Sequence, residues 1–101
     1  PLILVGMGGI NAEVHADSVM APAPITHGDA MAMIADLRGA AILGGTGGEA
    51  PADVEALADL LMTLSDLAVG WPGGMAEMDL NPVIVYAKGQ GLRVVDGLIV
   101  R

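Results

Sequence analysis

The chain of 101 residues contains no cysteine and no phenylalanine, and only four of its residues are basic. Without cysteine it can form no disulfide, zinc–thiolate site or thiol nucleophile, and we expect a protein of the reducing cytoplasm. Twelve acidic residues against four basic ones give a formal net charge of −8. Nucleic acids and anionic membranes attract clustered cations, so we expect neither as a partner. Chemistry on a phosphate group would need a metal ion, backbone N–H groups or cations from elsewhere.

Long apolar runs are also absent. The longest stretch without a charge is the first twelve residues, shorter than the ~18–20 apolar residues of a membrane-spanning helix. The chain starts at Pro1 directly in an apolar run with no basic leader, so we read no signal peptide and expect a piece of a longer polypeptide. With 53% hydrophobic residues, the chain can still build the core of one domain.

Apolar periodicity predicts strands near both ends of the chain. A short run with β-branched members predicts a buried strand over residues 2–5, and alternation of apolar and polar residues predicts another over 10–16. Near the C-terminus, strands over 76–86 and 92–100 flank a glycine-containing turn at 88–91, which is typical of a β-hairpin.

Two helices are predicted between these strands. Thr26 and Asp29 have the spacing of a capping box in front of a helix over 28–38. Asp53 begins a second helix with a leucine-rich stripe, which ends near Gly70. The order β-β-α-α-β-β predicts an α+β fold, namely an antiparallel β-sheet with two helices packed on one face.

The C-terminal hairpin carries the strongest candidate site. If Tyr86 and Gly91 close a four-residue turn, the numbers of paired residues sum to 177 and Asn81 lies opposite Asp96. Directly opposed residues of an antiparallel pair have Cβ atoms about 4.5–5.5 Å apart. Asp79 lies two positions before Asn81 and therefore on the same face. A carboxylate, an amide oxygen and a second carboxylate are hard ligands that suit Mg²⁺.

The alternative interpretation is a solvated polar face on an edge hairpin. Against it stands the neighbourhood of Asp96, which lies among Val94, Val95, Leu98 and Ile99. A carboxylate in apolar surroundings is costly unless it is paired.

Other motifs carry weaker signals. The glycines at 6–9 lack the third glycine of a dinucleotide fingerprint, and those at 44–48 lack the lysine of a phosphate-binding loop. His15 and His27 lie far apart in the sequence, and we interpret both as lone surface histidines. The methionines at 31, 33 and 62 are predicted to fill the core.

Several of these motifs occur together in one order. They are Gly8–Val14, Asp29–Ala30 at a helix start, Pro51–Asp53, the Glu-x-Asp-x-Asn-Pro strand at 77–82, and Val95–Asp96. The set resembles the C-terminal half of the ATP-grasp domain of ADP-forming acyl-CoA synthetases, the acetate–CoA ligase group. It is similar, more distantly, to the β subunit of succinyl-CoA synthetase. The resemblance implies that residues 1–101 are the C-terminal lobe of an ATP-grasp fold.

The resemblance also implies a reaction, in which acid, CoA and ATP interconvert with acyl-CoA, ADP and phosphate through a phosphohistidine on another domain. Asn81 and Asp96 would hold the Mg²⁺ that bridges the phosphates of ATP or ADP. Glu13 would lie at the same end of the cleft, and Asp79 would support the metal ligands. The partners implied are the remaining domains of a CoA ligase, which would bind CoA and the carboxylic acid. Because a lone half-domain exposes apolar surface, self-association is also expected.

The sequence departs from the family at three basic positions. Ala21, Gly47 and Leu98 stand where the family usually has an arginine or another basic residue. Phosphoryl transfer normally requires positive charge around the moving group. Two hypotheses therefore stay open, a metal-holding half of a nucleotide cleft and a degenerate, non-catalytic remnant with a structural or regulatory role.

Overall fold

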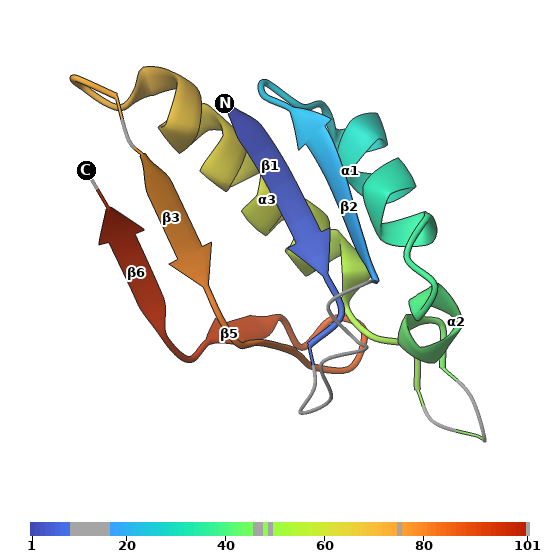
Figure 1. Cartoon of the computed structure of the whole chain (residues 1–101). Coiled ribbons are helices and arrows are strands. Elements are labelled where there is room, and N and C mark those ends of the chain that lie inside the picture. Colours follow the sequence, from blue (N-terminus) through green and yellow to red (C-terminus); the bar gives the residue numbers. More distant parts are fainter. Residues whose placement is uncertain (9–16, 46–47, 49, 75, 101) are drawn as a thin grey trace.

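The computed structural model describes the chain except for residues 9–16, 46–47, 49, 75 and 101 (Figure 1). An antiparallel ribbon forms its N-terminal part. Strand β1 (Leu2–Gly6) pairs with β2 (Ser18–Pro22), with Leu2 opposite Pro22 and Gly6 opposite Ser18. The strand expected over 2–5 is therefore confirmed, whereas the one expected over 10–16 lies outside the described residues.

Side chains of this ribbon alternate between core and solvent, as a period of two requires. Ile3 is buried, and Val5 and Val19 pack against the core. Leu4 and its partner Met20 point to the other face and are 57% and 61% exposed. One face of β1 and β2 thus supports the core, and the opposite face carries uncovered apolar side chains.

Helix α1 (His27–Ala35) begins with the predicted capping box. The Asp29 amide donates to Thr26 Oγ1 at 3.1 Å, and the Thr26 amide donates to Asp29 Oδ2 at 2.8 Å. Two backbone N–H groups that the helix leaves free are satisfied in this way. The face of α1 that carries Met33 and Ile34 is buried. A short helix that the sequence did not predict, α2 (Ala40–Leu43), follows α1.

Helix α3 (Val54–Gly70) provides the other half of the core. Leu57, Ala58 and Leu61 are buried against α1, while Val54 and Ala68 pack at the margin. The helix ends where Trp71 adopts an extended conformation, in front of Pro72, which cannot continue a helix. Both predicted helices are thus confirmed. Met33 is buried and Met31 and Met62 are partly buried, as expected of core filler.

A buried hydroxyl joins the two long helices. Ser65 is 0% exposed on α3, and its Oγ accepts a hydrogen bond of 2.9 Å from the amide of Ile25. Ile25 is itself buried and directly precedes Thr26, which caps α1. This bond fixes the start of α1 against the middle of α3.

The C-terminal part is a long antiparallel ribbon in two sections. Strand β3 (Glu77–Leu80) pairs with β6 (Gly97–Val100), and β4 (Val83–Val85) pairs with β5 (Leu92–Val94). In Figure 1, β4 and β5 turn away from the direction of β3 and β6. A cis Asn81–Pro82 peptide bond lies between β3 and β4.

The expected α+β class is confirmed, and the strands are antiparallel. They form three separate two-stranded sheets in the described residues, and the single sheet expected from the sequence is not present there. Helix α1 contacts β2 and helix α3 contacts β1, and both helices lie on one side of the β1–β2 ribbon (Figure 1). Within the described part of the chain, no helix is both long and apolar enough to span a membrane.

Replacement of Ser65 by alanine tests the hydroxyl between the helices. Ser65→Ala leaves the buried Ile25 amide without an acceptor, so we expect the free energy of unfolding to fall by about 1–3 kcal/mol. Urea denaturation of the chain measures this loss. Thr63→Ala, at an exposed position of the same helix, is the control and should have a much smaller effect. Equal losses in the two variants would show that the Ser65 bond is dispensable.

Candidate functional site

Asn81 and Asp96 meet at the junction between the two sections of the C-terminal ribbon. The amide of Asn81 donates to the carbonyl oxygen of Asp96 at 3.0 Å. The pairs on either side, Leu80 with Gly97 and Val83 with Val94, have residue numbers that sum to 177. The register predicted from the sequence is therefore present, and it sets Asn81 directly opposite Asp96.

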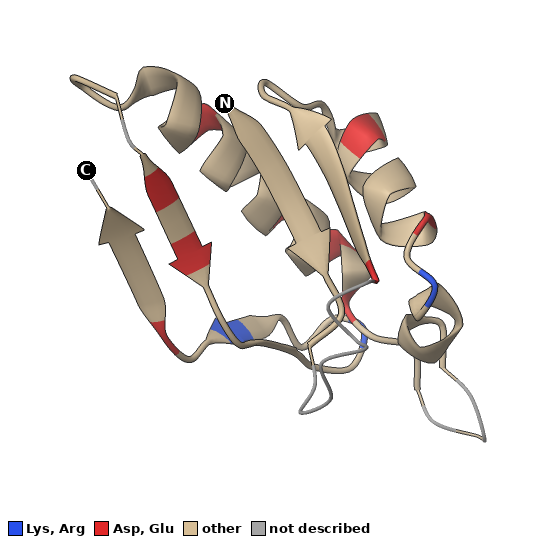
Figure 2. Cartoon of the chain, in the orientation of Figure 1, with Lys and Arg blue, Asp and Glu red and all other residues tan. Residues whose placement is uncertain are grey.

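Asp79 lies on the solvent-facing side of β3. Glu77 and Asp79 are exposed, whereas Met78 and Leu80 between them are half-buried. Asp79 pairs with Leu98 of β6, two positions from the Asn81–Asp96 pair. Figure 2 shows acidic residues on β3 and at the start of β6. The ribbon therefore carries its carboxylates on strand segments that lie beside each other.

The surroundings of Asp96 differ from the expectation. Its apolar neighbours Val95, Leu98 and Ile99 are 53%, 59% and 46% exposed, and Asp96 is exposed with them. Burial thus imposes no cost on this carboxylate, and the argument that it must be paired was wrong. Its Oδ1 accepts a hydrogen bond of 2.8 Å from the Gly97 amide. This short local bond restrains the side chain at the beginning of β6.

The oxygen donors at this junction fit a hard divalent cation. Asp79 and Asp96 supply carboxylates and Asn81 supplies an amide oxygen, and all three are exposed. Mg²⁺ prefers such ligands and keeps several waters, so a small open set suffices. Within the described ranges, no three His, Asp or Glu side chains cluster as a metal site of their own. Glu13, the fourth predicted residue, lies outside the described residues.

Positive charge is scarce around these residues. Ala21 lies within β2 opposite Ile3 and is half-buried. Leu98 is exposed on β6 opposite Asp79, and Gly47 lies outside the described residues. Among the described residues, the basic residue on the strands of this ribbon is Arg93, which is exposed on β5.

The side chain of Asp53 accepts two backbone hydrogen bonds, whereas from the sequence Asp53 was expected only as an acidic residue at the start of the second helix. It is 8% exposed. Its Oδ1 accepts from the Ala56 amide at 3.1 Å, which caps α3, and its Oδ2 accepts from the Gly91 amide at 2.8 Å. The Gly91 bond, followed by the Ala56 bond, holds the pKa of the Asp53 carboxyl below its usual range, although burial opposes this shift. Gly91 lies 38 positions away, and no local motif signals that contact.

The two histidines were interpreted as lone surface residues. His27 is exposed at the start of α1, but its Nε2 lies 2.7 Å from Glu55 Oε2 on α3. A protonated His27 would form an ion pair with Glu55, which is worth little at such an exposed position. His15 lies outside the described residues. His27 therefore bridges the two helix starts and takes no part in the acidic ribbon.

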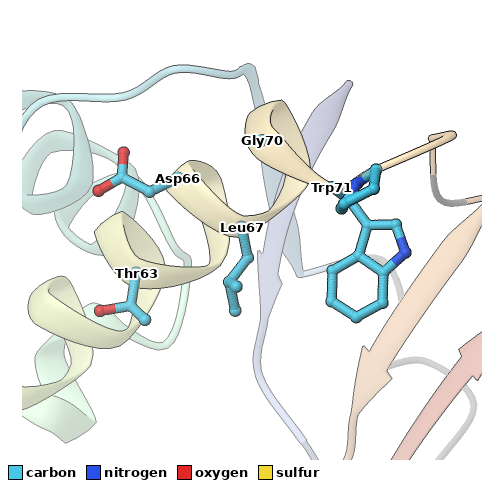
Figure 3. Close-up of a pocket in the computed structure, with 6 residues that line it drawn as sticks. Thr63, Asp66, Leu67, Gly70 and Trp71 are labelled. Atoms are coloured by element: carbon cyan, nitrogen blue, oxygen red, sulfur yellow. The ribbon is translucent and has the colours of Figure 1, made fainter.

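A shallow hollow lies at the other end of α3. Its lining residues come from the last turns of the helix and the segment after it: Thr63, Asp66, Leu67, Gly70, Trp71 and Pro72. Figure 3 shows Leu67 and the Trp71 indole on the same side, with Asp66 pointing away from them. One carboxylate beside apolar side chains offers no set of groups for catalysis. The hollow is also at the end of α3 opposite to Asp53 (Figure 1).

Comparison with known proteins gives consistent matches over nearly the whole chain. The ATP-grasp domain family matches residues 1–100. The β subunit of the ADP-forming acetate–CoA ligase II of Pyrococcus furiosus is 45% identical over 98 residues, which are 97% of this chain and 42% of that protein. The ADP-forming 4-hydroxybutyrate–CoA ligase of Nitrosopumilus maritimus is 40% identical over 96 residues, 95% of this chain and 14% of that protein.

Solved structures agree with these matches. An acetyl-coenzyme A synthetase of Korarchaeum cryptofilum, crystallised with coenzyme A and Mg-AMPPCP, superposes with a TM-score of 0.89 at 38% identity. The match covers 99% of this chain and 46% of that one. A Pyrococcus horikoshii protein superposes with a TM-score of 0.90 at 41% identity, over 98% of this chain and 41% of that one. The chain spans less than half the length of each of these relatives.

The lowered pKa of Asp53 predicts how stability depends on pH. A carboxyl whose pKa is lower in the folded protein stabilises the fold above its unfolded pKa of about 3.9, and this contribution is lost as the pH falls through the folded pKa. Asp53→Asn cannot ionise at this position. We expect wild type to be the more stable protein at pH 7 and its advantage to shrink as the pH falls below about 4. Urea denaturation of both proteins over this pH range measures the difference, and an advantage independent of pH would contradict the prediction.

Proposed function

The chain belongs to the ATP-grasp domain family, and from this premise we propose that it forms the Mg²⁺-holding part of a nucleotide cleft in an ADP-forming acyl-CoA synthetase. The observation that carries the proposal is the direct pairing of Asn81 with Asp96 on an exposed ribbon. The pairing supports the proposal because the backbones of these two residues are hydrogen-bonded across the ribbon, and they are the residues that the family motif would place at the metal. In this proposal both residues hold the metal, Asp79 supports them, and Glu13 lies at the same end of the cleft.

The reaction proposed for the whole enzyme is acid, CoA and ATP to acyl-CoA, ADP and phosphate, with a phosphohistidine on another domain as the carrier. Bound Mg²⁺ would neutralise charge on the nucleotide phosphates during transfer. This chain's part is to orient the oxygens of Asn81 and Asp96 toward one point. The short bond from the Gly97 amide to Asp96 Oδ1 restrains one of these groups. A restrained ligand loses less conformational freedom when the metal binds.

The names of the relatives support this assignment. Those from Pyrococcus furiosus and Nitrosopumilus maritimus are ADP-forming CoA ligases. The Korarchaeum cryptofilum structure contains Mg-AMPPCP, and the phosphohistidine segment of that enzyme points towards the nucleotide-binding site. We propose the same cofactors, Mg²⁺ with ATP or ADP, for this chain. The acid and CoA would bind to parts of the enzyme outside these residues.

Uncovered apolar side chains support a partner on the strand face opposite to the helices. Leu2 and Leu4 of β1 and Met20 of β2 are 67%, 57% and 61% exposed. An apolar surface of this kind usually marks an interface. We propose that the other half of the ATP-grasp domain, from a further segment or subunit, covers it. Self-association of the isolated chain would use the same surface.

The second candidate is a non-catalytic ATP-grasp remnant with a structural or regulatory role. The observation that favours it is the absence of cations at Ala21, Gly47 and Leu98. An active enzyme of this composition would need positive charge from the other half of its cleft. A remnant would keep the fold and the apolar interface but bind no metal–nucleotide complex.

Titration of the full-length protein with Mg²⁺-ADP tests the metal site. We expect the wild type to bind and Asp96→Asn to bind at least about tenfold more weakly. Even the loss of a residue that only hydrogen-bonds to a metal ligand typically lowers metal affinity about 10–100-fold. Isothermal titration calorimetry with and without Mg²⁺ measures both constants.

Asp59→Asn is the matched control, since it removes the same charge from an exposed position of α3 and should leave the binding constant unchanged. If the wild type shows no metal-dependent nucleotide binding, the enzymatic proposal fails and the remnant is favoured. Equal weakening by Asp96→Asn and Asp59→Asn would show that net charge, and not a metal ligand, determines binding.

A further inference from the structure

A buried carboxylate joins the start of α3 to the turn of the β4–β5 ribbon. Asp53 accepts from the Ala56 amide with one oxygen and from the Gly91 amide with the other. Gly91 has a φ of +79°, a left-handed conformation that side-chain-bearing residues rarely adopt. The turn therefore holds a special backbone conformation at the residue that donates to Asp53.

Backbone hydrogen bonds attach the same turn to the same segment. The Asp53 amide donates to the Tyr86 carbonyl at 2.8 Å, and the Lys88 amide donates to the Pro51 carbonyl at 2.8 Å. The Tyr86 amide in turn donates to the Gly91 carbonyl at 2.9 Å, which closes the turn. The first two of these backbone bonds attach the segment 51–53 to residues 86 and 88, on the β4 side of the turn, and the Asp53 side chain adds the bond to Gly91 on the β5 side.

From this turn to the candidate metal ligands, the numbers of paired residues keep the sum of 177, although β4–β5 and β3–β6 are separate two-stranded sheets. Val85 pairs with Leu92, Ile84 with Arg93 and Val83 with Val94. The Val95 amide then donates to the Pro82 carbonyl at 3.0 Å, and the pair Asn81–Asp96 follows. Any change in how the turn closes is transmitted along this ladder, because a slip of one residue changes every pair.

Among the described residues, burial of the ribbon decreases from the turn toward the ligands, although Val83 is still half-buried. Val85 and Leu92, beside the turn, pack against the core. Further along, Val94 and Val95 are 38% and 53% exposed, and Ile84 is 44% exposed. The ribbon is thus fixed to the body of the protein at its turn, and Asn81 and Asp96 lie on the less supported part.

We infer that Asp53 is a positioning residue for the metal–nucleotide site, which acts by fixing the β4–β5 turn and thereby the placement of Asn81 and Asp96 relative to the core. The inference rests on the proposed function of these two residues. It assigns to Asp53 a role beyond helix capping, because a cap requires one acceptor oxygen and Asp53 uses two. Supporting groups of this kind hold binding residues in their productive geometry.

Asp53→Ser separates the two roles. Serine is a good N-cap and its hydroxyl can accept from the Ala56 amide, but its single oxygen cannot also serve Gly91. Thr26→Ala is the matched control, since it removes the N-cap of α1 and destabilises a helix without touching the turn. Both variants are made in the full-length protein and measured well below their unfolding temperatures.

Mg²⁺-ADP titration and amide NMR spectra then give the decisive readouts. We expect Asp53→Ser to bind Mg²⁺-ADP about 10–100-fold more weakly, and Thr26→Ala to bind as the wild type does. In the absence of nucleotide, the amide resonances of Asn81 and Asp96 should shift in Asp53→Ser, while those of the core residues Ala30 and Ala58 stay in place. If Asp53 only caps α3, the resonances of Asn81 and Asp96 should stay unchanged in the folded Asp53→Ser variant.

Normal affinity in Asp53→Ser, or equal losses in Asp53→Ser and Thr26→Ala, would overturn the inference while leaving the proposed function intact. Absence of binding by the wild type would refute the proposed function and the inference with it. If Asp53→Ser fails to fold, Asp53→Asn provides the same test. It keeps one acceptor oxygen and the backbone bonds between the segment 51–53 and the turn. We then expect an intermediate loss of affinity for Mg²⁺-ADP.

Discussion

The register of the C-terminal ribbon is the constraint on which the candidate site depends. One set of pairings runs from Glu77 opposite Val100 to Val85 opposite Leu92, and it determines that Asn81 faces Asp96. A shift by one residue would turn one of these side chains to the other face of the ribbon. The backbone pairing therefore determines which side chains can contribute to the site.

The core supports this ribbon indirectly. Helices α1 and α3 pack against β1 and β2, and the buried bond from the Ile25 amide to Ser65 fixes the helices to each other. Asp53 caps the start of helix α3, and its side chain and backbone also bind the turn of β4 and β5. A stable helix pair thus holds a ribbon that is itself largely exposed. Asn81, Asp79 and Asp96 are exposed on this ribbon.

The sequence predicted those features that depend on neighbours in the chain. Thr26 and Asp29 cap a helix, the stripe through Leu57 and Leu61 is buried, and Gly91 closes a hairpin turn, since each follows from local spacing. It could not predict the exposure of Asp96, because that depends on which elements fail to cover β6. Nor could it predict the Asp53–Gly91 bond, which joins residues 38 positions apart.

Electrostatics distinguishes an active enzyme from a remnant of one. A formal net charge of −8 repels a polyphosphate unless a cation lies between them. The proposed nucleotide binding therefore requires that Asn81 and Asp96 hold a metal ion. The most direct test is a crystal structure of the full-length protein with Mn²⁺ in place of Mg²⁺ and with ADP. The account predicts an anomalous scattering peak between the side-chain oxygens of Asn81 and Asp96. A peak elsewhere, or these two side chains on opposite faces of the ribbon, would contradict it.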